Sequence, residues 1–114
     1  MATDLFTPIL NDRTRSVRFF NGRLLSGEAT YSALIRAKDV LLKSLPADHD
    51  LLVLAFGIFV HQVTFIQPHA FIFLGYNDDG HSTVVVAHFS QVVAKLVYRP
   101  KKGPERVITG FAKA

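Results

Sequence analysis

Residues 51–77 contain no Asp, Glu, Lys or Arg, and this uncharged segment constrains the fold more than any other feature of the sequence. Charged side chains are almost never fully buried, so a long stretch without them is rarely left facing water. Side chains alternate between the two faces of a strand, and in residues 57–66 and 69–76 both alternating sets are mostly apolar. An antiparallel sheet with one wet face would instead place a polar residue at every second position. The sequence therefore predicts central strands that are buried on both faces.

One helix is predicted before this segment. Ser26 is a suitable N-cap, Glu28 follows in the first turn, and Pro46 ends the helical pattern. The apolar residues between them share one face at helical spacing: Tyr31, Leu34, Ile35, Leu41, Leu42 and Leu45. We expect a helix of about five turns that starts near Gly27 and covers one face of a sheet.

The rest of the chain is predicted to form strands and turns. Asn21-Gly22 indicates a hairpin with strands at residues 16–20 and 23–25, because both central residues of a type I′ turn need a positive φ. Residues 51–66 are predicted to form one long strand that bends or bulges at Gly57. Turns are expected at Gln67-Pro68 and at residues 77–80. Further strands are expected at residues 69–76, 82–89, 92–99 and 106–111. Charges at Lys95, Arg99 and Arg106 indicate that the last two strands lie near an edge of the sheet.

This order of elements predicts a single α+β domain over residues 1–114. One long helix packs on a curved, mainly antiparallel meander sheet of five to seven strands. A chain of 114 residues is long enough for one domain with its own core. The order is similar to that of helix-grip folds of the hot-dog and cystatin types. That resemblance concerns architecture, and it implies no activity.

Composition excludes several classes of protein. The sequence has no cysteine, which excludes disulfide frameworks and thiolate zinc sites. Its ten Phe and 49% hydrophobic residues exclude a disordered chain. Residues 1–15 lack the pattern of a signal peptide, and the apolar run at residues 51–60 is shorter than the about 20 residues that span a bilayer. We expect a soluble, cytoplasmic protein without a cofactor or a bound metal.

A single helix covers one face of a sheet, so the other apolar face needs a second cover. We expect this cover to be another copy of the chain, in a homodimer or larger homo-oligomer. An apolar patch of several hundred Å² left exposed on that face would be large enough to mark an interface. The alternative is that residues 1–15 fold back over that face.

Two histidines are candidates for chemistry. With a four-residue turn at residues 77–80, His69 lies opposite His88, on one face with Phe71, Phe73, Val84 and Val86. Two neighbouring imidazoles can act as an acid–base pair or bind a metal. A zinc site needs a third protein ligand, and none is evident at a matching position. The simpler interpretation is a hydrogen-bonded pair at the rim of the core.

Aromatic residues are candidates for binding a ligand. A concavity between helix and sheet is the expected place for an apolar small molecule or partner segment. Its expected lining consists of Phe59, His61, Phe71 and Phe73.

Basic residues are candidates for binding a nucleic acid. The net charge is +4, and residues 44–94 contain four Asp and no Lys or Arg. The basic groups therefore gather in two other places: Arg13, Arg15, Arg18 and Arg23 at the first hairpin, and Arg99, Lys101, Lys102 and Arg106 at the last turn. If these adjoin, they attract phosphates; the alternative is an ordinary solvated surface.

The sequence contains no nucleophile elbow, no glycine-rich phosphate loop and no His-Glu-x-x-His motif. We therefore expect a non-enzymatic binding module that takes an apolar small molecule or protein partner and acts as a homo-oligomer. Two alternatives stay open. One is a nucleic-acid-binding protein that uses the arginine-rich hairpin surface, and the other is a small hydrolase or isomerase that uses His69 and His88.

Overall fold

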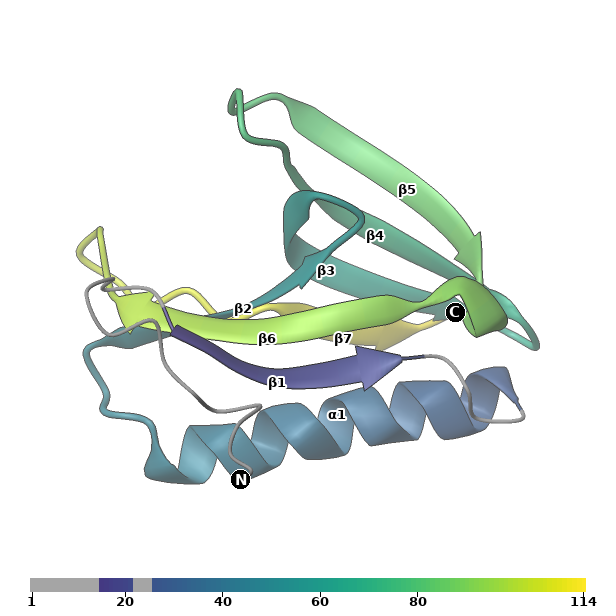
Figure 1. Ribbon diagram of the computed structural model, residues 1–114, viewed down its shortest axis with the longest axis horizontal. Coiled ribbons are helices and arrows are strands. Elements are labelled where there is room, and N and C mark those ends of the chain that lie inside the picture. Colours follow the sequence, from purple (N-terminus) through teal and green to yellow (C-terminus); the bar gives the residue numbers. More distant parts are fainter. Residues whose placement is uncertain (1–14, 22–25) are drawn as a thin grey trace.

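The structure is a computed structural model that describes residues 15–21 and 26–114 (Figure 1). Its elements are strand β1 (Arg15–Asn21), helix α1 (Gly27–Ser44), strands β2 (His49–Ala55), β3 (Ile58–Ile66), β4 (Ala70–Tyr76) and β5 (Ser82–His88), the short 3-10 helix η2 (Phe89–Gln91), and strands β6 (Val93–Pro100) and β7 (Gly110–Lys113). The strand order is β1-β6-β2-β3-β4-β5, and the sheet is not closed. Neighbours along this path are antiparallel, whereas β7 runs parallel to β3. The predicted α+β architecture, one long helix on a mainly antiparallel sheet, is confirmed.

Helix α1 begins and ends where the sequence predicts. The Ser26 side chain accepts a hydrogen bond from the Ala29 N–H at 3.0 Å, which satisfies one of the free donors of the first turn. Leu45 is already extended, because the residue before Pro46 is driven out of the helical region. Figure 1 shows α1 along one side of the sheet, with β5 at the edge farthest from it.

Residues 51–66 form two strands rather than the one bent strand expected from the sequence. Ala55 pairs with Ile58, so Phe56 and Gly57 make a two-residue hairpin turn. Both have a positive φ, 52° at Phe56 and 76° at Gly57, as a type I′ turn requires. Gly57 adopts this geometry without strain, whereas Phe56 does so against the preference of an L-residue.

The end of the chain inserts between β2 and β3. These strands pair only near their turn, from Val53–Val60 to Ala55–Ile58. Farther along, the Leu51 N–H donates to the Val107 carbonyl at 2.9 Å, and the Thr109 N–H donates to the Leu51 carbonyl at 3.0 Å. Strand β7 then continues along β3.

The Thr109 side chain ties this junction together. Its hydroxyl accepts from the Val53 N–H at 2.9 Å and donates to the Val60 carbonyl, and Thr109 is buried. Strand β6 lies between β1 and β2, and β7 lies against β3. Strand β6 is next to the edge strand β1, and among the described strands β7 pairs only with β3, so the expectation that the last two strands lie near an edge is confirmed. Arg99 of β6 has an internal partner, the Asp50 carboxylate at 3.4 Å.

The core lies between α1 and the sheet. Tyr31 of α1 stacks on Phe65 with ring centroids 5.4 Å apart, and Phe65 stacks on Phe71 at 5.0 Å. The buried cluster consists of Tyr31, Leu34, Val53, Ala55, Ile58, Val60, Val63, Phe65, Phe71, Phe73, Ala87, Val92 and Ala94. Side chains thus occupy the space between helix and sheet where a ligand concavity was expected.

The predicted burial of both sheet faces is observed at β2. Toward β5, the face opposite the core becomes increasingly exposed. Leu51, Leu52 and Val53 are all buried, so β2 is covered on both sides. In β3 and β4 the core face is buried and much of the other face is half-buried. On that second face of β5, Val84 is 60% exposed and Val86 is 67% exposed. The alternative cover, residues 1–15, falls almost entirely outside the described residues, as does the turn of the predicted Asn21-Gly22 hairpin. The described partner of β1 is β6.

Candidate functional site

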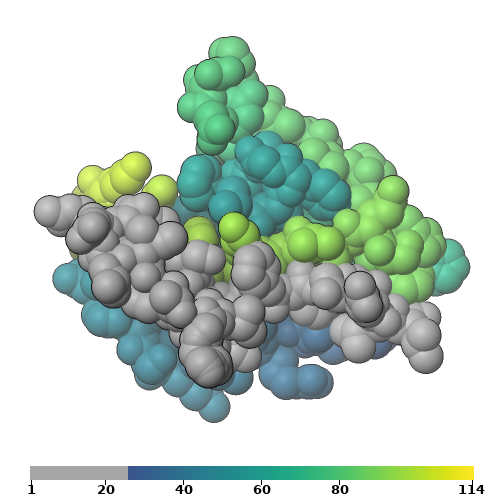
Figure 2. Space-filling model, in the orientation of Figure 1, coloured from purple at the N-terminus to yellow at the C-terminus, as the bar shows by residue number. Residues whose placement is uncertain are grey.

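An open concavity lies at the tip of the β2–β3 hairpin, and we call it the hairpin concavity. Its volume is about 400 Å³, which falls in the range of small-molecule sites. Three segments build it: the β2–β3 turn, the start of β6 and the loop between β4 and β5. Its lining residues are Leu54, Ala55, Phe56, Gly57, Phe59, Asp78, Val93, Ala94 and Lys95. In Figure 2 the turn, in teal, lies at the surface of the molecule.

The pairing of β2 determines which side chains face the hairpin concavity. Leu54 is paired with Phe59 of β3 and with Lys95 of β6, and paired residues project from the same face. The adjacent pair, Val53 with Val60, projects from the other face and belongs to the core. Leu54, Phe59 and Lys95 therefore line the concavity from the sheet face opposite the core. Two further lining residues, Ala55 and Ala94, belong to the core cluster.

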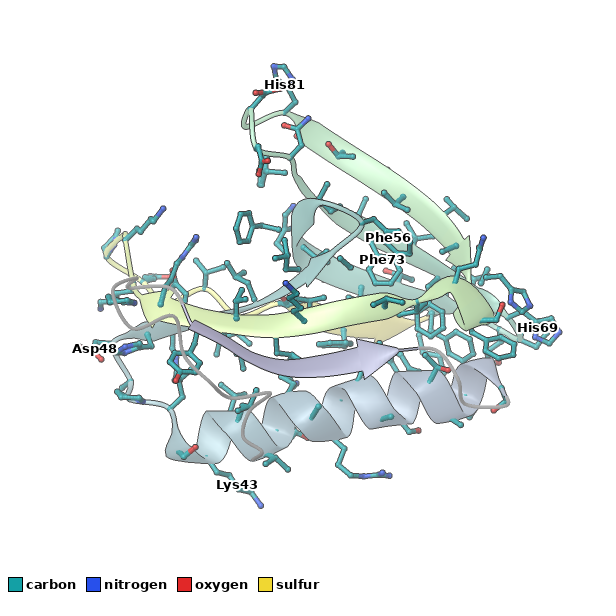
Figure 3. All side chains as sticks on the ribbon, in the orientation of Figure 1. Lys43, Asp48, Phe56, His69, Phe73 and His81 are labelled. Atoms are coloured by element: carbon teal, nitrogen blue, oxygen red, sulfur yellow. The ribbon has the colours of Figure 1, made fainter. Side chains whose placement is uncertain are left out.

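Phe56 stands at this concavity in a strained conformation. Its φ is 52° and its side chain is 42% exposed. The left-handed region costs an L-residue about 1–2 kcal/mol, and Asn or Gly is the usual occupant of this turn position. The ring packs on Phe73 with centroids 5.3 Å apart, and Figure 3 shows the two rings side by side. Backbone strain of this kind concentrates at functional sites, so Phe56 is the most informative residue of the lining.

The cation that contacts Phe59, Arg99, is bonded to a buried carboxylate, Asp50. Asp50 is 1% exposed, and it accepts hydrogen bonds from the Val107 N–H at 2.8 Å and from the Arg99 guanidinium at 3.4 Å. The same guanidinium lies 5.7 Å from the centroid of the Phe59 ring, in a cation–π contact. Arg99 is thereby held in internal contacts.

The four residues expected to line a ligand site are not gathered in one place. Phe59 lines the hairpin concavity. Phe71 and Phe73 are both 0% exposed in the core. His61 is exposed and lies against Tyr76, with ring centroids 5.4 Å apart. The pairing of β3 with β4 has a register shift between Val60 and Gln62. At this shift the side chains no longer alternate strictly between the two faces, and His61 is exposed although it lies between buried Val60 and Val63.

His69 and His88 do approach each other, with ring centroids 5.5 Å apart. The strand register is one residue away from the expected one, because Ala70 rather than His69 is opposite His88. The loop runs over residues 77–81, where the Asn77 N–H donates to the His81 carbonyl at 3.0 Å.

That shift moves the two expected sets of neighbours to opposite faces. Phe71 and Phe73 belong to the core, whereas Val84 and Val86 are exposed. His88 Nδ1 accepts from the Ser90 N–H at 3.1 Å, so this imidazole caps η2. Among the described residues no group of three His, Asp or Glu side chains is placed to hold a metal.

The basic residues are only partly described. Arg13 and Arg23 lie outside the described residues, and Arg15 and Arg18 are placed through the backbone of β1. Arg15 pairs with Tyr98, which puts the start of β1 beside the end of β6. Arg15 of the first basic segment and Arg99 of the second therefore lie at the same end of the β1–β6 pair.

Two cations in the segment after β6 have internal partners. Arg106 Nε donates to the His49 carbonyl at 2.9 Å, and Lys101 Nζ donates to the Pro104 carbonyl at 3.2 Å. Lys102 is exposed. Nucleic-acid binding stays a prediction that none of these contacts tests.

The polar turn before β2 is separate from the hairpin concavity. His49 Nδ1 lies 2.9 Å from an Asp48 carboxylate oxygen, and this hydrogen bond holds the pKa of Asp48 below its ordinary value. Figure 3 shows Asp48 near one end of the molecule, well away from Phe56. Asp48 is exposed, so we interpret this pair as part of a surface turn.

Comparisons of the chain with protein-family models, curated proteins and solved structures find no match. In the part of the chain that the structure describes, no helix is long and apolar enough to cross a membrane.

Most residues of the hairpin concavity were not predicted from the sequence. Leu54, Phe56 and Val93 look like ordinary strand residues, and only Phe59 was a candidate. The available signal was Phe56-Gly57. A glycine inside a strongly apolar run can mark a turn as well as a bulge, and a turn there places the preceding aromatic residue at the tip.

Proposed function

We propose that this chain is a non-enzymatic binding module that takes an apolar small molecule in the hairpin concavity and acts as a homo-oligomer. The observation that carries the proposal is Phe56, an exposed aromatic residue held at positive φ beside a cavity of about 400 Å³. A turn selected for stability alone would have Asn or Gly at this position. Retention of a phenyl ring there is explained if the ring contacts a ligand.

The surroundings of Phe56 support an apolar ligand with a polar end. Leu54, Phe59 and Val93 supply apolar surface, while Asp78 and Lys95 place one charge of each sign in the lining. Binding pockets commonly combine apolar walls with a few polar groups that orient the ligand. The described lining includes no His, Ser, Thr or Tyr, so it offers no hydroxyl nucleophile paired with an imidazole base.

Self-association is supported by the other half of the sheet. The exposed valines of β5 lie on the face opposite the core, and Tyr76 of β4 on that face is 48% exposed. Contiguous apolar surface of this kind is typical of an interface.

A Phe56→Asn substitution is expected to weaken binding of the hydrophobic fluorescent probe anilinonaphthalene sulfonate by about tenfold. Asn tolerates positive φ, so relief of about 1 kcal/mol of backbone strain partly offsets two losses: the ring contact with Phe73, worth about 0.5–1.5 kcal/mol, and the buried part of the Phe56 side chain, worth about 1–2 kcal/mol. The free energy of unfolding should consequently fall by no more than about 2 kcal/mol. Fluorescence titration measures the binding, and urea denaturation measures the stability.

The matched control is Tyr76→Asn. Tyr76 is an aromatic residue of similar exposure, 48% against 42% for Phe56, and it lies outside the lining of the hairpin concavity. It should leave probe affinity unchanged. Equal probe affinity in wild type and Phe56→Asn, with both folded, would rule out this cavity as the binding site.

A further inference from the structure

The edge strand β5 has none of the features that usually prevent a sheet edge from pairing. Such features are lysines, prolines, bulges and short length. Strand β5 has seven residues, contains no charged residue and no proline, and pairs with β4 without interruption from Ser82 to His88. Val84 and Val86 are the two most exposed large hydrophobic side chains of the described residues. Figure 1 shows β5 at the outer edge of the sheet.

The opposite edge, β1, is protected in two of these ways. Its pairing with β6 is interrupted by a register shift between Ser16 and Arg18, and its sequence contains Arg15 and Arg18. A bulge and basic residues both discourage addition of a further strand. Head-to-tail pairing of β5 with β1 of another copy is therefore disfavoured, and pairing of β5 with β5 is favoured.

The sequence of β5 is self-complementary in the antiparallel direction. Ser-Thr-Val-Val-Val-Ala-His is centred on Val85. When two copies pair about that centre, Val84 of each faces Val86 of the other, and Ser82 faces His88. Cross-strand pairs of β-branched residues are favourable, and no like charges meet within the paired strands.

The backbone N–H and C=O groups at the free edge of β5 are placed to form the hydrogen bonds of this register. The Phe89 N–H donates to the His69 carbonyl at 2.8 Å, so every second residue back from Phe89 directs its backbone groups toward β4. The intervening residues, among them Val84 and Val86, direct theirs toward the free edge. The register centred on Val85 pairs these intervening residues with one another, and the ladder can form without rearrangement.

We infer that two copies of this chain join through antiparallel β5–β5 pairing about Val85, so that the two sheets become one. The inference specifies the interface of the proposed homo-oligomer and is independent of ligand binding in the hairpin concavity. The pairing buries the free edge of β5 and not the exposed face, which continues across both copies because Ile72 and Leu74 of β4 lie beside Val86 and Val84 in each.

Two double substitutions test the register. Val84→Lys with Val86→Lys places lysine opposite lysine across the interface, whereas Val84→Lys with Val86→Glu places lysine opposite glutamate. Both variants put two charged residues on the same exposed positions, so they perturb folding of the single chain to a similar extent. The double-lysine variant should dissociate at least about tenfold more readily than the lysine–glutamate variant, as measured by sedimentation equilibrium. Circular dichroism checks that both are folded.

The control for net charge is Val40→Lys with Val107→Lys. These valines are 47% and 43% exposed and lie outside β5, so this variant gains the same charge and should associate like the wild type. A wild-type protein that stays monomeric at about 1 mM overturns both the inference and the proposed self-association. A wild-type dimer for which the two β5 variants dissociate equally overturns the interface alone. Neither result bears on the probe titration of Phe56→Asn.

Discussion

A Gly75→Ala substitution is expected to lower the free energy of unfolding by about 3 kcal/mol, near the upper end for overpacking a core. Gly75 is buried in β4 opposite Val60, next to the register shift in β3. A Cβ added there would clash with the Phe59 carbonyl oxygen and lie 2.9 Å from Val60 Cα. Both neighbours are backbone atoms, which cannot move aside by a side-chain rotation, so β3 or β4 must shift.

The shift would also reach the hairpin concavity, because Phe59 is part of its lining. Gly103→Ala is the control: a Cβ there meets nothing within 4 Å, and its cost should be at most about 0.5 kcal/mol. Urea denaturation of both variants gives the comparison. Equal midpoints for the two would show that β3 and β4 do not approach as closely as the structure has them.

Thr109→Val is expected to cost about 2–4 kcal/mol, since it leaves two buried backbone groups without partners at about 1–3 kcal/mol each. The hydroxyl accepts from the Val53 N–H and donates to the Val60 carbonyl, and valine can do neither. Valine has nearly the shape of threonine, so the loss reports the hydrogen bonds rather than a cavity.

Thr109→Ser separates the two contributions. Serine keeps the hydroxyl and loses one methyl group, which costs about 1 kcal/mol. Chemical denaturation should therefore rank the proteins as wild type, Thr109→Ser and Thr109→Val in order of decreasing stability. Were Thr109→Val the more stable of the two variants, the hydroxyl would not be the link between β2 and β3.

The helix and the loop after β4 could be predicted because their signals are local. Ser26 and Pro46 bound α1 through interactions within a few residues of themselves. The loop after β4 follows from Asn77, whose side chain accepts from the N–H groups of Asp79 at 2.9 Å and His81 at 3.0 Å. One extra residue in that loop changed the register, and with it the face on which each β5 side chain lies.

The hairpin concavity could not be predicted because it depends on packing between distant segments. Residues on both sides of Phe56 favour strands, and propensity does not reveal that the chain reverses between them. The Phe56 ring packs on Phe73, which lies in another strand, and this contact leaves no local sequence pattern. The insertion of residues 107–113 between β2 and β3 is likewise a long-range pairing without a local sequence pattern.

Strand β3 is bonded to β2 near its start, to β7 farther along and to β4 over most of its length. The hairpins that β3 forms with β2 and β4 therefore leave some of its backbone groups unpaired, and these groups find partners only when residues 110–113 pair with β3. Contacts so distant in the chain form late and slow the search for the native state. We accordingly expect amide exchange in β3 and β7 to be governed by one shared opening event, with the sheet behaving as a single cooperative unit.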